Sequence, residues 1–414
     1  MRNTAPLRRA GRRLPALFLF AAVIASFGGC ERREPAEQTP AAQSSDSGVR
    51  STTAAVTVPA ILPLTGPSAD LGQSVANGMR LAAEDLNRGR PSAAFNLRID
   101  DSKGKPTDAV TAYRASPPSG NARAVLSWMS SVGNALAPVA LRDSVALFVG
   151  AALPSLSSPT GLVVRAWPRA QHIGERMGEY ASSQNLQRVA ILYIDDEYGR
   201  SVADAFASVV QRGGISVVAR EPLAVGATDF RVSLERVKRM NPRGIYMPAY
   251  GAVYVSGLKQ IREILGDSVV VMADLPLLSA FTLPQFGDEL ENVVVTATAL
   301  DVRPYQTAAA REFAERYRAR FGRDADFNSG LGYMMFSIAA QATAASDGSG
   351  HGVAAYISRT GTFDGPLGPI RYDARNDCDV PMQIAQFRGG RLQPLTPLRR
   401  ADGEGVPGAT NPPR

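Results

Sequence analysis

Apolar and polar residues alternate along this chain in two distinct patterns. A short unbroken apolar run, VTVPAILPL (56–64), is typical of a buried strand. In the segment 73–87, apolar residues recur every three or four positions, which is the spacing of one helix face. These residues are Val75, Met79, Ala82 and Leu86. The folded part of the chain is therefore expected to begin with a strand and an amphipathic helix.

The same alternation continues over most of the chain. Short apolar runs predict strands at 95–99, 124–128, 146–149, 189–193, 215–220, 244–248 and 269–272. Helical spacing predicts helices at 198–211, 228–240 and 253–265, the second of which Thr228 and Asp229 can cap. Strands separated by helices of about 10–15 residues indicate parallel sheets with right-handed crossovers. We therefore expect an α/β fold.

The last quarter of the chain continues this pattern with shorter elements. Helical stripes at 310–321 and 331–345 contain aromatic and Met residues, which we assign to the core. A Gly- and Ser-rich loop is expected at 347–352, and short strands at 370–372, 383–387 and 392–395. The sequence is polar from Arg399 onward, so we expect 399–414 to be a tail.

The N-terminus has the pattern of an export signal. Five arginines precede an apolar run, 14–27, which Gly28, Gly29 and Cys30 follow. This arrangement resembles a bacterial lipoprotein processing site, which implies a signal peptide at 1–29 and a lipidated Cys30. A plain signal peptide cut nearby and an uncleaved signal anchor remain alternatives. The polar segment up to residue 55 is rich in Pro, Ser and Thr and is expected to be a flexible tether.

Net charge gives no reason to expect nucleic-acid binding. The whole chain of 414 residues has 45 basic and 38 acidic residues, a formal charge of +7. Residues 1–29 contain five Arg and no acid, so their removal leaves 40 basic and 38 acidic residues, or +2. The basic character therefore belongs mostly to the export signal.

Residues for catalysis or metal binding are scarce. The only histidines are His172 and His351, so a site built from several histidines is excluded. The sequence contains neither the G-x-S-x-G motif of serine hydrolases nor the H-E-x-x-H motif of zinc proteases. It also contains no phosphate-binding G-x-x-x-x-G-K-[ST] loop and no dinucleotide-binding G-x-G-x-x-G after a strand. The only cysteines are Cys30 and Cys378; a lipidated Cys30 would leave Cys378 as a lone thiol near a turn. We expect a protein that is not an enzyme and needs no cofactor.

Five segments resemble one known family in order and spacing. The segment PAILPLTGPSADLGQSVANGMRLAAEDLN (59–87) is similar to the opening of the leucine/isoleucine/valine-binding proteins. SWMSS (127–131), YIDDEYG (193–199), GATDFRVSL (226–234) and TFDGPLGPIRYD (362–373) match later motifs of the same family. These proteins are periplasmic substrate receptors of ABC importers, and the resemblance covers about 56–398.

The resemblance implies two α/β lobes, each a parallel-sheet βαβ sandwich, joined by a three-strand hinge with a ligand cleft between them. On this sequence, the first lobe would contain 56–168 and 297–358. The second lobe would contain 169–296 and 359–398. Open parallel sheets also bind ligands at the carboxyl ends of their strands, so a cleft at that place agrees with a general rule.

By resemblance, Ser130 and Ser131 form the first ligand loop, at the start of a helix whose free N–H groups suit a carboxylate. Simple helix capping by Ser130 is the alternative interpretation. Gly150, Ala151 and Ala152 match the second ligand loop. Amino-acid binders usually carry Thr where Ala152 stands, so one hydroxyl is missing here. This departure leaves α-amino-acid binding an open question.

Four further residues are assigned to the ligand site. Tyr198 and Tyr250 match aromatic residues of the second lobe that close over the ligand, and aromatic faces also stabilise an ammonium group. Asp274 matches the acid that receives the ligand's ammonium, although the family often has the longer Glu there. Trp128 is expected either to line the pocket or to belong to the core.

The resemblance implies a monomeric, lipid-anchored receptor on the periplasmic face of a membrane. It would capture a small zwitterion, such as a branched-chain or other amino acid or a related amide, and deliver it to an ABC permease. The first alternative is an envelope regulatory or scaffold lipoprotein that uses the same fold without transport, and the second is a hydrolase or other enzyme. The sequence leaves open the ligand, the permease and the choice between inner and outer membrane.

Overall fold

The computed structural model describes residues 55–90, 94–118, 123–152, 156, 160–407 and 409. The predicted signal peptide, Cys30 and the tether up to residue 54 lie outside these residues. None of the helices in the described ranges is long and apolar enough to cross a membrane.

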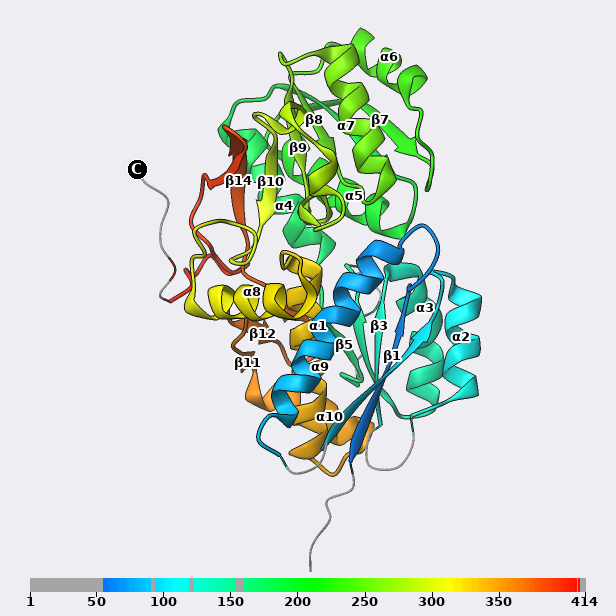
Figure 1. Cartoon of the computed structure of the whole chain (residues 1–414). Coiled ribbons are helices and arrows are strands. Elements are labelled where there is room, and N and C mark those ends of the chain that lie inside the picture. The colour runs from blue at the N-terminus through cyan, green and yellow to red at the C-terminus, as the bar shows by residue number, and fades with distance from the viewer. Residues whose placement is uncertain are drawn as a thin grey trace, which may run out of the picture. The chain divides into compact units, whose positions relative to one another are not determined.

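The first lobe is built on a five-stranded, fully parallel sheet (Figure 1). Its strands, in spatial order, are β2 (Phe95–Asp101), β1 (Val56–Leu62), β3 (Ala124–Trp128), β4 (Ala146–Gly150) and β5 (Val163–Arg165). Side chains of β1 alternate between two cores: Val58, Ala60 and Leu62 belong to one and Ile61 to the other. The sheet therefore carries apolar layers on both faces, as parallel sheets require.

Helices cover both faces of this sheet. On one side lie α2 (Pro106–Ala115) and α3 (Ser130–Arg142), and on the other α1 (Ala69–Asn87), α9 (Phe327–Ala344) and α10 (Gly350–Thr360). Helices α1 and α9 pack without a gap, because a Cβ at Gly78 would lie 1.9 Å from the Ser329 carbonyl oxygen. The Ser74 hydroxyl also donates to the carboxylate of Asp326, 252 positions later in the sequence.

The second lobe has a seven-stranded sheet in the order β15-β14-β10-β9-β8-β6-β7. Its parallel strands are β6 (Arg188–Ile194), β7 (Ser216–Leu223), β8 (Gly244–Met247), β9 (Val270–Ala273) and β10 (Val294–Ala297). Strands β14 (Gln383–Arg388) and β15 (Arg391–Pro394) add an antiparallel hairpin at one edge. Gly389 and Gly390 form its turn with φ of 57° and 70°, the positive values that a two-residue hairpin turn favours.

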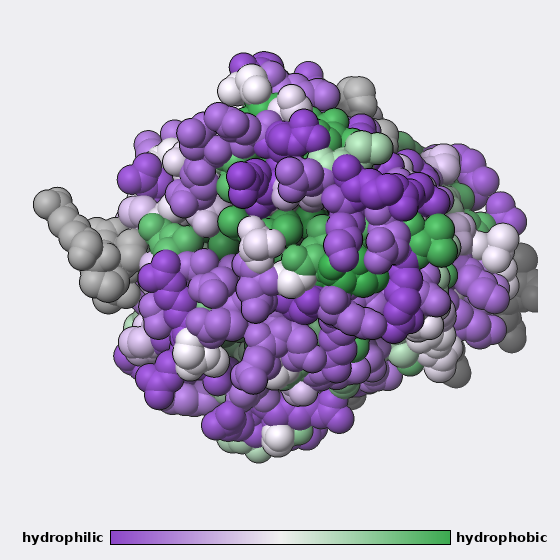
Figure 2. Space-filling model, turned by 90° about the horizontal axis from the view of Figure 1, so that it is seen from above, coloured by the Kyte–Doolittle hydropathy of each residue, from purple (hydrophilic) through white to green (hydrophobic). Residues whose placement is uncertain are grey.

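The second sheet is covered by α4 (Ala170–Ser183), α5 (Glu197–Arg212), α6 (Arg231–Arg239) and α7 (Ala252–Leu265). Figure 2 views the molecule from the second-lobe end, where hydrophilic residues surround a band of apolar ones. The large apolar side chains that remain exposed among the described residues are Val225, Val232 and Met240. All three belong to the second lobe.

A small antiparallel sheet of β11 (Thr362–Phe363), β12 (Ile370–Tyr372) and β13 (Cys378–Asp379) completes the structure. It is hydrogen-bonded to the first lobe, because the Asn376 amide donates to the carbonyls of Gly161 and Ala354. The Arg165 N–H donates to the Asn376 carbonyl as well. The predicted lobe bounds assign this sheet to the second lobe, as part of 359–398, whereas these hydrogen bonds run to the first. The exact bounds of the two lobes remain a prediction.

The chain passes between the two large sheets at three places. It leaves β5 for α4, returns from β10 to α8 (Ala308–Phe321) and α9, and enters β14 after β13. The α/β fold with two lobes built on parallel sheets is therefore confirmed. The antiparallel β14–β15 edge is the part of the second sheet that departs from an all-parallel arrangement.

Some local expectations differ from the structure. Helix α6 starts later than predicted, at Arg231 after Phe230, and neither Thr228 nor Asp229 is its N-cap. Helix α10 begins inside the expected loop 347–352, because the Ser349 hydroxyl caps it by accepting from the Gly352 N–H. Arg399, at the start of the expected tail, exchanges two backbone hydrogen bonds with Met382, so the chain there still packs on the body.

Candidate ligand-binding site

A small cavity of about 50 Å³ lies between the two lobes, where strands β3 and β4 face the starts of α5 and α7. It is lined by Leu71, Trp128, Met129, Ser130, Ser131, Gly150, Ala151, Ala152, Trp167, Asp196, Glu197, Tyr198, Tyr250 and Pro276. Every predicted ligand residue except Asp274 is in this set. The carboxyl ends of parallel strands meet here, as expected for a binding site in an α/β fold.

Several helices point their N-termini at the cavity. Helix α3 begins at Ser130, α5 begins at Glu197, and Tyr250 lies two residues before α7. Each helix start carries free N–H groups and about half a positive charge. None of the described residues that line the cavity is Lys, Arg or His. The groups here that favour a small anion are therefore the backbone N–H groups at the helix starts, while the acids Asp196 and Glu197 belong to the second-lobe side.

The structure distinguishes between two interpretations of Ser130. Met129, not Ser130, occupies the N-cap of α3, and its side chain makes no capping hydrogen bond. Ser130 is the first helical residue and is buried, while Ser131 is half-buried. Met129 has a φ of 82°, which costs a residue with a side chain of order 1–3 kcal/mol and is frequent at ligand sites. Helix capping thus does not explain Ser130.

The loop after β4 is shaped around an indole ring. A Cβ at Gly150 would lie 2.1 Å from a ring carbon of Trp128, so only glycine leaves room for the tryptophan. The Gly150 carbonyl accepts from the Met129 N–H at 3.1 Å, and the Ala151 carbonyl accepts from the Arg165 guanidinium at 2.9 Å. The carbonyl of Ala152 accepts from the Ala170 N–H at 3.0 Å. All three carbonyls of this predicted ligand loop therefore already accept a protein hydrogen bond.

Trp167 is a lining residue that the sequence analysis missed. Its ring meets Trp128 edge-to-face with centroids 5.2 Å apart, and meets Phe327 in the same way at 4.8 Å. Its indole Nε1 is buried and has no hydrogen-bond partner among the described residues. A buried N–H without a partner is rare and costs about 1–3 kcal/mol, so an acceptor atom from a ligand would stabilise this site.

Two acids, Asp196 and Glu197, also line the cavity. Asp196 accepts from the Gly199 N–H at 2.8 Å, which caps α5, and from the Tyr250 hydroxyl at 2.6 Å. Burial raises the pKa of Asp196 above its ordinary value. Glu197 accepts from the Asn134 amide at 2.9 Å, a hydrogen bond between α5 of the second lobe and α3 of the first. The run Asp195–Asp196–Glu197 at the carboxyl end of β6 is the sequence signal that could have identified these residues.

Asp274 lies behind the cavity wall. It is fully buried and accepts hydrogen bonds from the hydroxyls of Tyr198 and Tyr254. Burial raises its pKa to about 7, although the two tyrosine hydrogen bonds oppose this effect. In this conformation, Tyr198 therefore connects Asp274 to the cavity, and the carboxylate itself does not line it.

The described residues place neither a metal-binding cluster nor a reactive thiol at the cavity. The described residues contain no group of His, Cys, Asp and Glu suited to hold a metal ion. Cys378 is fully buried, its thiol donates to the Trp167 carbonyl at 3.3 Å, and burial raises its pKa to about 12. A thiol with such a pKa is a poor nucleophile. The arrangement is suited to holding a small molecule between two lobes.

Two α/β lobes, with a small cavity between them at the carboxyl ends of parallel strands, are the architecture of a class of binding proteins. A model of the family described as periplasmic binding protein matches residues 55–391. The chain therefore belongs to the periplasmic binding protein family. This family is not enzymatic, which confirms the expectation that the chain is not an enzyme.

Individual relatives are distant. The chain is 26% identical over 224 residues to the Leu/Ile/Val-binding protein BraC3 of Rhizobium johnstonii, a match that covers 53% of this chain and 61% of that protein. The match thus covers less than two thirds of that relative's length. The resemblance to Leu/Ile/Val-binding proteins is confirmed at this distance.

Solved structures show the same fold over nearly their whole length. A leucine-binding protein from Thermotoga maritima superposes with a TM-score of 0.73 and 20% identity, covering 82% of this chain and 98% of that one. A solute-binding protein of an ABC transporter from Rhodopseudomonas palustris, in complex with 3,4-dihydroxybenzoic acid, gives a TM-score of 0.75 and 21% identity over 86% of this chain and 99% of that one.

Proposed function

We propose that this protein is the substrate-binding component of an ABC importer and captures a small carboxylate-bearing molecule between its lobes. Membership of the periplasmic binding protein family supports the class of function. The observation that carries the choice of ligand is Trp167, which lines a cavity that several helix N-termini face and whose buried N–H has no partner among the described residues. Both features favour a ligand with an anionic, hydrogen-bond-accepting end.

A zwitterion is our first candidate for the ligand. The carboxylate would lie against Ser130, Ser131 and the Trp167 N–H at the first-lobe side. An ammonium group would lie toward the acids of the second lobe and the rings of Tyr198 and Tyr250. Relatives named for leucine, isoleucine and valine favour a branched-chain or other amino acid, or a related amide.

Asp196 and Asp274 are the two candidate partners for the ammonium. Asp196 lines the cavity directly, whereas Asp274 reaches it through the Tyr198 hydroxyl. If Asp274 receives the ammonium, as the sequence resemblance implies, the Tyr198 ring has to move when the ligand binds. If Asp274 does not contact the ammonium, its role is to orient the Tyr198 ring through their hydrogen bond.

An aromatic carboxylate is the second candidate. The cavity walls include two Trp and two Tyr rings, and Ala152 lacks the hydroxyl that amino-acid binders usually present there. A relative of the same fold holds 3,4-dihydroxybenzoic acid. Such a ligand would place its carboxylate as above and its ring among the aromatic side chains.

Capture requires the lobes to open. A cavity of about 50 Å³ has room for one or two water molecules, whereas small-molecule sites usually measure about 300–1,000 Å³. The Asn134–Glu197 hydrogen bond also spans the lobes beside the cavity. We therefore infer that the ligand enters an open form and shifts the hinge equilibrium toward a closed one.

Membrane attachment completes the proposal. We propose that residues 1–29 are removed and that lipidated Cys30 holds the protein on the periplasmic face of a membrane, near its permease. Metabolic labelling with a palmitate analogue tests this, because Cys30→Ser should lose both the label and the membrane association. Incorporation of the label into the Cys30→Ser variant would contradict lipidation at Cys30.

The ligand can be identified by a thermal-shift screen followed by calorimetry. The panel contains amino acids, their amides, short carboxylates and substituted benzoates. Saturable binding of one class, with tryptophan emission changing on binding, is expected, since both tryptophans of the chain line the cavity. Failure of every class to bind would favour the regulatory or scaffold alternative.

A comparison of leucine with 4-methylpentanoate isolates the ammonium site, because the second molecule lacks only the amino group. If leucine binds, substitution of the acid that holds its ammonium should weaken leucine more than tenfold, about 1.4 kcal/mol, and leave 4-methylpentanoate unchanged. Asp196→Asn and Asp274→Asn are tested in parallel. Equal effects on both ligands would show that neither acid touches the ammonium.

A further inference from the structure

A second, larger cavity lies away from the ligand cleft. It measures about 690 Å³ and shares no residue with the cleft cavity. Its walls come from the segment after β9, the crossover after β10, the α8–α9 turn and the β14–β15 hairpin. Both lobes therefore contribute, and the volume lies within the range of about 300–1,000 Å³ that is usual for small-molecule sites.

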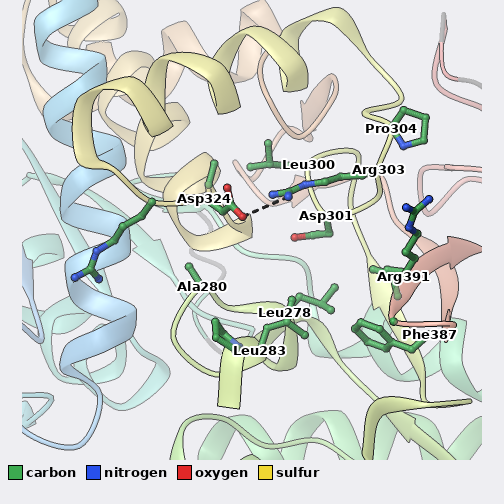
Figure 3. A pocket seen from close by; sticks show the side chains of 15 residues that line it. Leu278, Ala280, Leu283, Leu300, Asp301, Arg303, Pro304, Asp324, Phe387 and Arg391 are labelled. Atoms are coloured by element: carbon green, nitrogen blue, oxygen red, sulfur yellow. Dashed lines mark hydrogen bonds and ion pairs between the residues drawn. The ribbon is translucent and has the colours of Figure 1, made fainter. Parts of the chain in front are cut away.

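The lining divides into an apolar and a charged side. Figure 3 shows Leu278, Leu283 and Phe387 on one side and Arg303 with Asp324 opposite them, with Asp301 between. Leu278 and Phe387 are buried among the core residues. An occupant with both an apolar body and a charged end would match this division.

The described lining has three arginines, Arg303, Arg323 and Arg391, and two acids, Asp301 and Asp324, so its formal charge is +1. Asp324 is paired with Arg303 at 3.3 Å and also with Arg318. The Asp301 carboxylate accepts from the N–H and the hydroxyl of Thr298, at 2.8 and 2.7 Å. Arg391 makes no side-chain hydrogen bond or ion pair with any described residue, and the Arg323 guanidinium is instead stacked over the Phe281 ring, 4.9 Å from its centroid. A carboxylate can bind Arg391 without breaking an existing pair, and guanidinium groups match carboxylates with two parallel hydrogen bonds.

The walls of this cavity also connect to the cleft. Pro276 lines the cleft and Leu278 the second cavity, and both belong to the short helix η2 (Leu275–Leu278). Ala325 lines the second cavity, and Phe327, two residues later, packs edge-to-face on Trp167. An occupant would hold the β14–β15 hairpin of the second lobe against the α8–α9 turn, which leads into the first.

We propose that this cavity is an effector site for a small carboxylate with an apolar chain, held by Arg391 and by the apolar wall of Leu278, Leu283 and Phe387. Occupancy favours the interlobe arrangement described above and thereby changes the affinity of the cleft for its ligand. The binding step does not depend on the function proposed for the cleft. The effect on cleft affinity does.

Calorimetry with hexanoate tests the binding step, with hexanamide and hexylamine as neutral and cationic controls. We expect saturable binding of hexanoate alone and at least a tenfold loss in Arg391→Ala. Arg388→Ala is the matched control, since Arg388 is the cross-strand neighbour of Arg391 on the hairpin and does not line the cavity. Arg391→Lys should retain part of the affinity, and circular dichroism checks that each variant is folded.

The site would be overturned by no saturable hexanoate binding, by equal affinities in Arg391→Ala and Arg388→Ala, or by equal affinities for hexanoate and hexanamide. A loss caused by Ser130→Ala instead of Arg391→Ala would place hexanoate in the cleft and also overturn it. For the effector role, hexanoate should change tryptophan emission, because both tryptophans lie in the cleft and neither lines this cavity. Binding at Arg391 without that change would overturn the effector role and leave the cleft proposal untouched.

Discussion

At the scale of single residues, the cleft depends on side chains that fit closely around one indole ring. Gly150 leaves room for Trp128, Trp128 packs on Trp167, and the Trp167 carbonyl accepts from the Cys378 thiol. Small changes in this chain of contacts should therefore affect ligand binding before they affect the rest of the fold.

Gly150→Ala should displace Trp128, because the added methyl group would lie 2.1 Å from its ring. Overpacking of this kind costs about 1–3 kcal/mol. We expect a lower unfolding midpoint in denaturant, altered tryptophan emission and weaker ligand binding. Gly405→Ala is the control, since a Cβ there meets nothing within 4 Å. Equal behaviour of the two variants would contradict this account of Gly150.

Trp167→Phe tests the proposed hydrogen bond between the indole N–H and the ligand's carboxylate. The substitution keeps an aromatic ring but removes the N–H, which has no partner in the described structure. We expect some loss of stability from the smaller buried ring, and about tenfold weaker binding of the carboxylate ligand, since a hydrogen bond to a charged group contributes about 1.5 kcal/mol or more. Calorimetry with the ligand and its uncharged amide measures the effect. An equal loss for both molecules would mean that the N–H does not face the carboxylate.

At the scale of elements, the apolar pattern predicted most of the long strands and helices, and the resemblance predicted residues that, except for Asp274, line one cavity. Helix α5 extends over Glu197–Arg212 where 198–211 was expected, because its apolar spacing is regular. Ser130, Tyr198 and Tyr250 were brought to one cavity as the resemblance implied. Trp167 was missed because it follows the short strand β5 in an irregular segment, where no periodic pattern marks it. The position of Asp274 behind Tyr198 depends on side-chain packing that a single sequence does not contain.

The contact between helices α3 and α5 gives a prediction about closure. Glu197→Ala removes the hydrogen bond from Asn134, so the open form should become more populated and ligand affinity should fall several-fold. The radius of gyration from small-angle scattering should increase in the absence of ligand. Glu175→Ala is a matched control, because the Gln171 amide donates to Glu175 at 2.8 Å within α4 alone.

A double-mutant cycle sharpens this test. Asn134→Ala and Glu197→Ala should have non-additive effects on ligand affinity, whereas Gln171→Ala and Glu175→Ala should change neither affinity nor size. Additive effects of Asn134→Ala and Glu197→Ala would show that their hydrogen bond does not contribute to closure.

At the scale of the whole molecule, buried acids link stability to pH. The pKa of Asp274 is raised to about 7 and that of Asp301 to about 6, in both cases by burial. Between about pH 4 and these values, the folded protein keeps protons that the unfolded chain releases. The contribution of each acid to the free energy of unfolding therefore decreases as pH rises through this range.

Asp274→Asn should remove the larger of these two effects. Burial lowers the pKa of His172, and this effect makes the free energy of unfolding rise with pH. Because it opposes the effect of the acids, the difference in stability between variant and wild type is the quantity to follow. We expect the variant to gain stability relative to wild type as pH rises from about 4 to 7, measured by urea unfolding at each pH. Parallel curves would contradict a raised pKa for Asp274. Asp364→Asn, at an exposed site whose carboxylate makes no hydrogen bond or ion pair with a described residue, is a suitable control.

The close packing of α1 on α9 has a consequence for how this polypeptide is made. Helix α1 forms within the first hundred residues, yet its apolar face is covered by a helix encoded more than 200 residues later. The N-terminal segment thus lacks its packing partner until most of the chain has left the ribosome. If residues 1–29 direct export as proposed, the chain passes a translocation channel before it folds, and the delay is then useful because a first lobe that completed early would block passage.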